Sequence, residues 1–286
     1  MDFKITSPKN KAGLLKAMQE GKNFRFGAGY TDLLMELKKQ EETSFTIINL
    51  AQLNDKTFTE INTISGGLRI GSLATAAEIV NDKFITQHFP ALQEAAHSLA
   101  SSQIREVATI GGNLCTASPS GDMACALMAL EAQCEILSAN GKTRTVPISG
   151  FFTGPRKTVL QKKEVLRSVL VPLLEKNRKL HSGFIKVGTR RSMECSVVSL
   201  AYHIHLDRND SIVHAGVAIG ASAPTIRFAK TACDLISGNN LKTISQKDKE
   251  EFAAKVVSYA SPITDIRATA WYRKEVLFNI SKSIFE

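Results

Sequence analysis

The sequence predicts an α+β fold built from two parts, with a boundary near residue 175. Before that point, short strand-like runs alternate with helical runs and glycine turns. Beyond it, three strand-like runs come first and the helices follow. Strands and helices grouped in this way are typical of α+β domains. A chain of 286 residues can bury a sizeable core in one large domain or in two to three smaller ones.

The first fifty residues predict a helix, a strand, a helix and a strand, in that order. The first helix, over 7–21, opens with a Ser-Pro pair, which favours a helix start, and closes at a glycine. The run over 24–29 predicts a short strand that enters a glycine turn, and the helix over 31–40 repeats leucines at helical spacing. The last run, 45–50, is rich in β-branched residues and therefore predicts a strand.

Two hairpins, two helices and one further strand are predicted over 61–172. One hairpin turns at Gly66-Gly67 and the other at Asn140-Gly141, the strongest local hairpin signal in the chain. One helix starts near Thr75, and a second runs from Pro90 to about residue 104. The run over 164–172 predicts a strand that ends at its proline.

The last hundred residues predict an antiparallel three-stranded sheet followed by helices. Strands are expected over 182–190, 195–206 and 211–223, and helices over 225–238, 246–260 and 268–285. His203 and His205 alternate with apolar neighbours, so both point to one face of a strand. No third ligand is apparent in the sequence. A polar strand face is therefore favoured over a metal site.

Composition narrows the class of protein. Five cysteines, an odd number without a C-x-x-C pair, argue against a disulfide framework or a zinc site. The N-terminus lacks an apolar signal region, and no run of about 18 apolar residues occurs, so a cytoplasmic protein without a membrane span is predicted. The net charge of +9 is scattered, and the basic stretch 176–191 has few aromatic residues. A positive face for an anionic ligand or an acidic partner is favoured over nucleic-acid binding.

Two glycine turns carry the functional signal. FGAGYTDLL (26–34) and ATIGGNLCTASPSGD (108–122) place glycines, hydroxyls and Asn113 beside helix-forming runs. Glycines let the backbone approach a ligand, and successive amides can cradle a pyrophosphate. Neither turn fits G-x-G-x-x-G, and no P-loop occurs. A phosphate-bearing ligand is predicted, with Asp122 as an acceptor from its ribose hydroxyls. No Ser/His/Asp motif supports hydrolysis, so the chemistry would come from a cofactor.

These motifs resemble a known family. AGYTDL at 28–33 is similar to a family A-G-G-T-D-L turn, IREVATIGGN at 104–113 to I-R-N-V-A-T-I-G-G-N, and TASPSGD at 116–122 to the xanthine-dehydrogenase form of the next segment. The chain thus resembles, over nearly its whole length, the FAD-binding subunit of molybdenum hydroxylases. That group contains xanthine dehydrogenase, carbon monoxide dehydrogenase and nicotinate dehydrogenase.

The resemblance implies a fold and a site. Residues 1–175 would form an FAD-binding domain of the vanillyl-alcohol-oxidase-like (PCMH) type, with α+β subdomains of about 1–52 and 53–175. Residues 176–286 would form the C-terminal domain of such flavin subunits. The implied pyrophosphate turns comprise Phe26, Gly27, Ala28, Gly29, Tyr30, Thr31, Asp32 and Leu33, and then Thr109, Ile110, Gly111, Gly112 and Asn113. Thr116 and Asp122 would hold the ribose region, Leu99 and Ala100 would lie near the adenine, and Leu166 and Lys186 near the isoalloxazine.

Tyr30 departs from the family pattern, because a second glycine is usual at that position. The backbone approach there is expected to differ, and the tyrosine ring could pack on the cofactor.

The resemblance also implies an oxidoreductase function. Substrate would be oxidised at a molybdopterin centre on a large partner subunit. [2Fe–2S] clusters on a small partner would pass electrons to non-covalent FAD on this chain, which would deliver them to NAD⁺ or another acceptor. A dimer of heterotrimers is expected. Two alternatives stay open: a self-contained PCMH-type flavin oxidoreductase, and a non-enzymatic nucleotide- or nucleic-acid-binding module.

Overall fold

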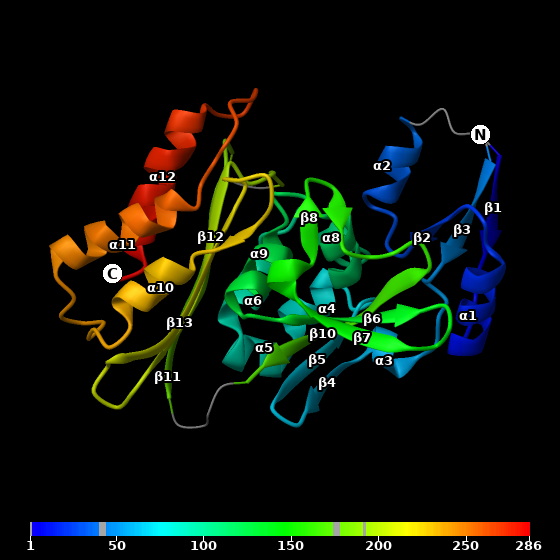
Figure 1. Ribbon diagram of the computed structural model, residues 1–286, viewed down its shortest axis with the longest axis horizontal. Coiled ribbons are helices and arrows are strands. Elements are labelled where there is room, and N and C mark those ends of the chain that lie inside the picture. Colours follow the sequence, from blue (N-terminus) through cyan, green and yellow to red (C-terminus); the bar gives the residue numbers. More distant parts are fainter. Residues whose placement is uncertain (1, 40–43, 174–177, 191–192) are drawn as a thin grey trace.

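A computed structural model describes residues 2–39, 44–173, 178–190 and 193–286. Its elements form three sheets, which follow one another along the longest axis of the molecule, and a small two-stranded hairpin beside the middle sheet (Figure 1). The N-terminal sheet lies at one end, the five-stranded sheet in the middle, and the C-terminal sheet with its helices at the other end. In the described part of the chain, no helix is long and apolar enough to cross a membrane.

The N-terminal unit is a parallel three-stranded sheet with strand order β1-β3-β2. Its elements are β1 (Asp2–Thr6), α1 (Lys11–Glu20), β2 (Phe24–Gly27), α2 (Leu33–Leu37) and β3 (Ser44–Asn49). The predicted order of helix, strand, helix and strand is confirmed, but the edge strand β1 was missed. Helix α1 begins at Lys11 instead of residue 7, because the Asn10 side chain caps it by accepting a hydrogen bond from the Gly13 amide at 2.9 Å. Helix α2 is also shorter than predicted and ends at Leu37.

Gly13 in the first turn of α1 offers a test of this local structure. A Cβ atom there would lie 3.5 Å from both Asn10 Oδ1 and Pro8 Cβ, which is ordinary contact. We expect Gly13→Ala to raise the free energy of unfolding by about 0.5 kcal/mol, because alanine loses less backbone entropy in a helix. Urea unfolding of both proteins measures the difference. A less stable variant would contradict the assignment of Gly13 to an unstrained helical turn.

The middle unit is an antiparallel sheet with strand order β4-β5-β10-β6-β7, covered by short helices. Both predicted hairpins and the strand ending at Pro172 are confirmed. The elements are α3 (Lys56–Thr59), β4 (Ile61–Ile64), β5 (Gly67–Gly71), α4 (Ala76–Asn81), α5 (Lys83–His88), α6 (Pro90–His97), α7 (Ser102–Arg105), α8 (Ile110–Thr116), α9 (Asp122–Ala129), β6 (Gln133–Ser138), β7 (Thr143–Pro147), η1 (Ile148–Gly150), β8 (Phe152–Gly154), β9 (Lys157–Thr158) and β10 (Glu164–Pro172).

In this unit the sequence predicts where helices begin more accurately than where they end. Thr75 and Glu78 form a capping box at the start of α4, and Pro90 occupies the first turn of α6. The helix predicted from Pro90 to about residue 104 is wrong as one element. It stops at His97 and resumes as α7, because Ala100 takes a left-handed conformation with φ 43°. A left-handed alanine cannot continue a right-handed helix.

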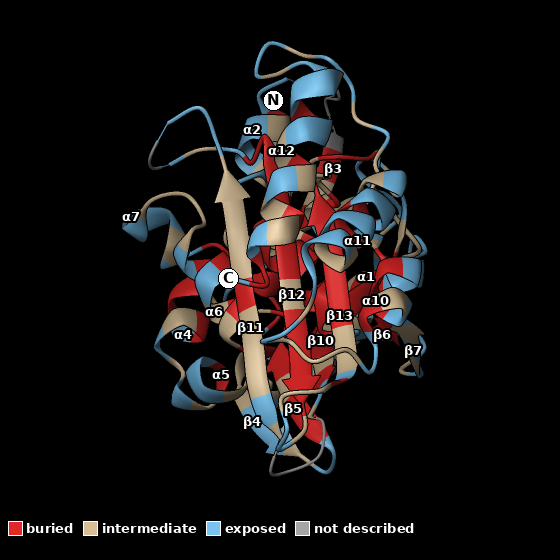
Figure 2. Cartoon of the chain, turned by 90° about the vertical axis from the view of Figure 1, so that its left-hand side faces the viewer, coloured by how far each residue is buried: buried red, intermediate tan, exposed pale blue. Residues whose placement is uncertain are grey.

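The C-terminal unit is an antiparallel sheet of β11 (Lys179–Val187), β12 (Val198–Leu206), β13 (Ile212–Gly220) and the two-residue β14 (Arg227–Phe228). The predicted meander is confirmed, with β14 as a short addition. Helices α10 (Lys230–Ile236), α11 (Gln246–Ser258) and α12 (Ala270–Ser283) cover one face, and α6 and α9 cover the other (Figure 1). Strands β12 and β13 are therefore largely buried, whereas β11 is only partly so (Figure 2).

His203 and His205 lie on the inner face of this sheet. They share a face as predicted, and both are almost fully buried, so this polar pair is covered and not solvated. The two Nε2 atoms are 2.9 Å apart, and the His203 ring packs near Phe89. Burial lowers the pKa of His203 to about 3 and that of His205 to about 4, so the pair is neutral at pH 7. No group of three or more His, Cys, Asp or Glu residues in the described ranges could hold a metal ion.

Candidate cofactor site

A cavity of about 920 Å³ lies where the N-terminal and middle units meet. This volume is at the upper end of the range of roughly 300–1,000 Å³ that is typical of small-molecule sites, so a large ligand fits. Sixteen of the nineteen predicted site residues line it: Phe26, Ala28, Gly29, Tyr30, Thr31, Asp32, Leu33, Leu99, Ala100, Thr109, Gly111, Gly112, Asn113, Thr116, Asp122 and Leu166. Gly27, Ile110 and Lys186 do not line the cavity.

The first glycine turn joins β2 to α2 and presents backbone donors. Among the described residues, no hydrogen bond from the amides of Ala28, Gly29, Tyr30 or Thr31 is found. Backbone amides need a partner, which can be water or a ligand. Gly29 also makes the closest approach in the site, because a Cβ atom there would lie 1.8 Å from the Val107 carbonyl oxygen. Because it has no side chain, Gly29 lets the first turn pack against the backbone of Val107, which immediately precedes the second turn.

Tyr30 adopts a backbone conformation that is rare for residues with a side chain. Its φ is 63°, in the left-handed region that glycine adopts most easily. Its ring lies against Gly27, where a Cβ atom would be 2.5 Å from the ring carbons. It also packs on the small core of Leu37, Phe45 and Ile47. Burial raises the pKa of the Tyr30 hydroxyl. The ring is therefore supported by protein contacts as well as lining the cavity.

The amides of the second glycine turn were expected to bind a pyrophosphate, but they bind other parts of the protein. The amides of Ile110, Gly111 and Asn113 donate to the carbonyls of Ala74, Ser72 and Thr109 respectively. The Gly112 amide donates to the Thr109 hydroxyl at 3.0 Å. These four amides are therefore hydrogen-bonded within the protein and are not available to a ligand. At Gly111 and Gly112 the second turn consequently offers a stretch of wall without side chains, whereas the unpaired amides belong to the first turn.

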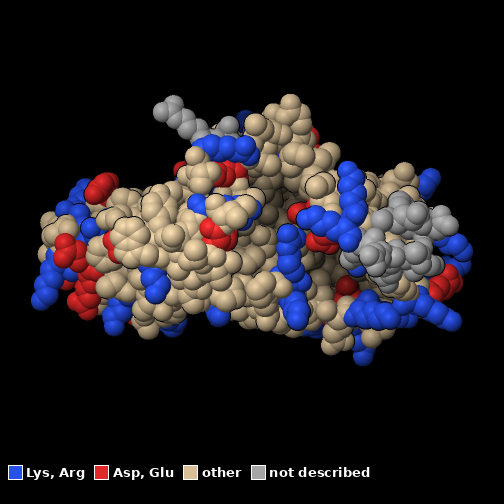
Figure 3. All heavy atoms as spheres, turned by 90° about the horizontal axis from the view of Figure 1, so that it is seen from above, with Lys and Arg blue, Asp and Glu red and all other residues tan. Residues whose placement is uncertain are grey.

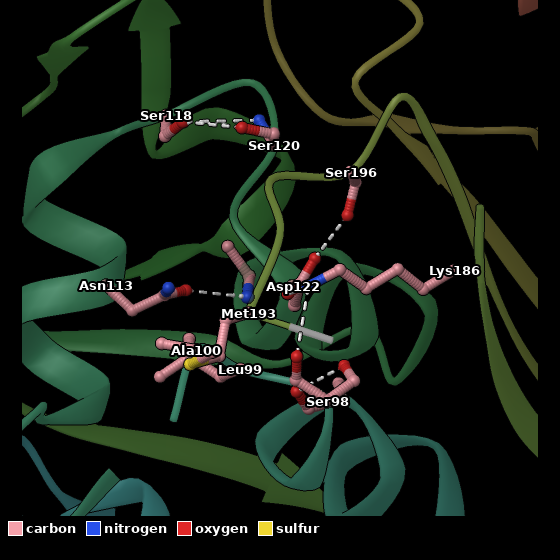
Figure 4. A network of polar contacts seen from close by, with 12 residues as sticks. Ser98, Leu99, Ala100, Asn113, Ser118, Ser120, Asp122, Lys186, Met193 and Ser196 are labelled. Atoms are coloured by element: carbon pink, nitrogen blue, oxygen red, sulfur yellow. Dashed lines mark hydrogen bonds and ion pairs between the residues drawn. The ribbon is translucent and has the colours of Figure 1, made fainter. Parts of the chain in front are cut away.

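Asp122 is a buried carboxylate of the cavity wall with two side-chain partners (Figure 4). It lies in the first turn of α9 and is only 4% exposed. Its Oδ2 pairs with Lys186 Nζ at 2.6 Å, and its Oδ1 accepts a hydrogen bond from the Ser196 hydroxyl at 2.7 Å. Burial raises the pKa of the Asp122 carboxyl, and the Lys186 charge opposes that rise.

Lys186 stands behind Asp122 and not at the cavity surface. Its ammonium also donates to the Ser98 carbonyl at 3.0 Å. Arg105 donates to the next two carbonyls, those of Leu99 and Ala100, at 3.0 and 3.3 Å. Lys186 and Arg105 therefore fix the loop of Ser98, Leu99 and Ala100, part of which the family resemblance predicts to lie near an adenine. Any effect of Lys186 on a ligand would pass through Asp122.

Several lining residues were not predicted. Glu36 on α2 pairs with Arg156, in the turn between β8 and β9, at 3.1 Å, and approaches Arg25 at 3.9 Å. Thr116 donates to Asp32 at 3.2 Å, which gives a second bridge between the two units. The cavity is further lined by Ser72, Leu73, Ser118, Ser120, Met193, Glu194 and Cys195. Of these residues, only Ser118 and Ser120 belong to a stretch that the sequence had singled out, TASPSGD. The ion pair of Glu36 with Arg156 joins residues that are far apart in the chain, so no local pattern reveals it.

The residues present fit a dinucleotide such as FAD. Unpaired amides in the first turn suit phosphate oxygens, the second turn allows close approach, and a buried carboxylate can accept from hydroxyls. Lys and Arg side chains flank the hollow that is visible near the middle of the upper face (Figure 3). The lining itself combines two arginines with four carboxylates: Arg25, Arg156, Asp32, Glu36, Asp122 and Glu194.

Two family models match the chain. The model described as FAD binding domain in molybdopterin dehydrogenase matches residues 1–174, and the model described as CO dehydrogenase flavoprotein C-terminal domain matches residues 184–286.

Similar proteins agree with these matches. The xanthine dehydrogenase FAD-binding subunit of Escherichia coli O157:H7 is 34% identical over 262 residues, which covers 90% of this chain and 86% of that protein. The glyceraldehyde dehydrogenase medium chain of Sulfolobus acidocaldarius is 27% identical over 285 residues, covering 100% and 98%. Reconstituted CO dehydrogenase from Oligotropha carboxidovorans has the same fold, with a TM-score of 0.90 at 21% identity over 99% of this chain and 96% of that one. The predicted fold class is thereby confirmed.

Proposed function

The chain belongs to the family of FAD-binding domains of molybdopterin dehydrogenases, and from this premise we propose that it is the electron-transferring flavin subunit of a multi-subunit molybdenum hydroxylase. A large subunit with molybdopterin would oxidise the substrate, and a small subunit with [2Fe–2S] clusters would deliver the electrons. The cavity of about 920 Å³ between two glycine turns carries this proposal, because it gathers sixteen of the nineteen residues implied by the family pattern.

Bound FAD would accept electrons from one-electron carriers and release them in pairs. The chain's own residues would bind and orient it. The amides of the first turn would hold phosphate oxygens, Asp122 would accept from ribose hydroxyls, and Lys186 would keep Asp122 ionised and in place. The loop fixed by Arg105 would pack against the adenine. The predicted position of Lys186 near the isoalloxazine stays a prediction.

The finer features of the reaction also stay proposals. A xanthine-like purine is the favoured substrate class, because TASPSGD resembles the xanthine-dehydrogenase form and the E. coli relative is named for that activity. NAD⁺ is the favoured acceptor, a cytoplasmic location is favoured, and a dimer of heterotrimers is the favoured assembly.

Flavin retention tests the proposal. The full chain, incubated with FAD and desalted, should keep both visible flavin absorption bands. Asp122→Ala should weaken FAD binding about ten- to hundredfold, because a hydrogen bond to a charged group is worth about 1.5–3 kcal/mol. Asp234→Ala, which alters an exposed carboxylate on α10, should bind normally. Colourless wild-type protein, both alone and purified with its partners, would overturn the proposal.

A further inference from the structure

Arg273 is a buried arginine near the start of α12, and its side chain holds two backbone carbonyls of the C-terminal unit. The residue is only 4% exposed. Its Nη1 donates to the Val197 carbonyl at 2.6 Å and to the Ala221 carbonyl at 2.9 Å, and its Nη2 pairs with Asp265 at 2.8 Å. Removing a guanidinium from water is costly, and an apolar residue would pack α12 on the sheet without that cost. The two carbonyl contacts are what an apolar residue could not replace.

The two carbonyls lie at the same end of the C-terminal sheet. Val197 comes directly before β12, and Ala221 comes directly after β13. These strands are antiparallel, and Ser199 pairs with Gly220 close to that end. Arg273 therefore fixes the place where one strand begins and its neighbour ends.

The segment before Val197 belongs to the wall of the cofactor cavity. Cys195 lines the cavity, and the Ser196 hydroxyl donates to Asp122 at 2.7 Å (Figure 4). Ser196 is itself buried. Because Ser196 and Val197 share a peptide bond, holding the Val197 carbonyl limits where the Ser196 hydroxyl can lie. Arg273 is thus connected to the buried carboxylate of the site through one residue.

The second carbonyl belongs to a residue that also contacts the cavity wall. The Ala221 amide donates to the Pro119 carbonyl at 2.6 Å, and the residues on either side of that proline, Ser118 and Ser120, line the cavity. Ala221 has a φ of 57°, in the left-handed region. An alanine keeps such a conformation only where surrounding contacts hold it, and Arg273 supplies one of them.

We propose that Arg273 is a positioning residue for the cofactor, holding the wall segments 195–196 and 118–120 in the arrangement that binds FAD. It does not itself line the cavity. This inference rests on the proposed function, because it takes FAD as the ligand. FAD binding and the contacts of Arg273 then favour one another, as any two coupled events do. An arginine with a purely structural role would change stability and leave the affinity for FAD unaltered.

The test uses the full chain, purified with its partners and freed of flavin. Equilibrium dialysis against a series of FAD concentrations gives the affinity, and thermal unfolding gives the stability. Arg273→Met removes the guanidinium, and we expect the Kd for FAD to rise about tenfold, which is within the usual range for coupled sites. Arg273→Lys keeps a cation but not the planar fork of donors, so a smaller rise is expected. The lysine variant carries the test if the methionine variant does not fold.

Leu277→Ala is the matched control on the same helix. Leu277 is fully buried in the core of the C-terminal unit, so its truncation should lower the unfolding temperature at least as much. We expect this variant to bind FAD as the wild type does. Ser196→Ala combined with Arg273→Met should weaken binding by less than the product of the two single effects, since both act on one segment.

Wild-type affinity in the Arg273 variants would overturn the positioning role. An equal loss of affinity in Leu277→Ala would also overturn it, because general loss of stability would then be the cause. Effects of Ser196→Ala and Arg273→Met that multiply would do the same, since Arg273 would not act through this segment. A wild-type chain that binds no FAD, alone or with its partners, would instead overturn the proposed function.

Discussion

Gly29→Ala should abolish measurable FAD binding and lower the free energy of unfolding by about 1–3 kcal/mol, the usual cost of overpacking. A Cβ atom at this position would lie 1.8 Å from the Val107 carbonyl oxygen and 3.3 Å from the Ala108 Cα. These are backbone atoms, so they cannot rotate away as a side chain would. The two segments must separate, and the amides of the first turn would then move away from the second turn.

Two measurements check this expectation. FAD titration followed by flavin fluorescence gives the affinity, and urea unfolding gives the stability. Gly150→Ala is the matched control, because a Cβ atom there would be 3.6 Å from Val146 Cγ1, an ordinary contact. If Gly29→Ala bound FAD as tightly as the wild type, the close approach of the two turns would not be what shapes the site.

The glycine turns could be predicted from the sequence because their signals are local. Gly29 and Gly111 stand beside helix-forming runs, and the cavity does form where these turns meet. What their amides do could not be predicted. Gly111 donates to Ser72, a residue 39 positions earlier, and no local pattern reveals such a partner. The difference between the two turns, with unpaired amides in the first and internally bonded amides in the second, therefore appears only in three dimensions.

The same limit applies to the charged groups. Asp122 was singled out because a carboxylate after a hydroxyl-rich turn suits a ribose, and it does line the cavity. Its pairing with Lys186 joins residues 64 positions apart, and Glu36 meets Arg156 across 120 positions. The short N-terminal strand was missed for a related reason, since β1 is defined by its parallel pairing with β3. The Ser7-Pro8 pair predicted the wrong start for the first helix, because the Asn10 side chain caps the helix three residues later.

Lys186→Met should destabilise the protein by an amount that grows with pH. The substitution removes the ammonium but keeps most of the side-chain volume, and it leaves a buried carboxyl without its ion-pair partner. Losing one partner of a buried pair typically costs about 3–5 kcal/mol when the other stays charged. Burial already raises the pKa of Asp122, and loss of the lysine raises it further.

Because the pKa of Asp122 is raised in the folded protein, the contribution of this carboxyl to stability falls as pH rises. In the unfolded chain the carboxyl titrates at about 3.9, which is below its pKa in the folded protein. Folding therefore favours the protonated form, and the associated stability is full below the unfolded pKa and is lost as pH rises through the folded pKa. The difference in unfolding free energy between wild type and Lys186→Met should be smallest at acid pH, where the Asp122 carboxyl is protonated in both proteins, and should grow as pH rises through the raised folded pKa of that carboxyl.

A double variant identifies the group responsible. In Lys186→Met/Asp122→Asn the buried side chain cannot ionise, so its stability relative to Asp122→Asn should not change with pH over this range. Urea unfolding of the four proteins at a series of pH values completes the cycle and isolates the pairwise coupling. A cost of Lys186→Met that is the same at every pH would assign the loss to the Ser98 contact of the lysine instead of to the buried carboxylate.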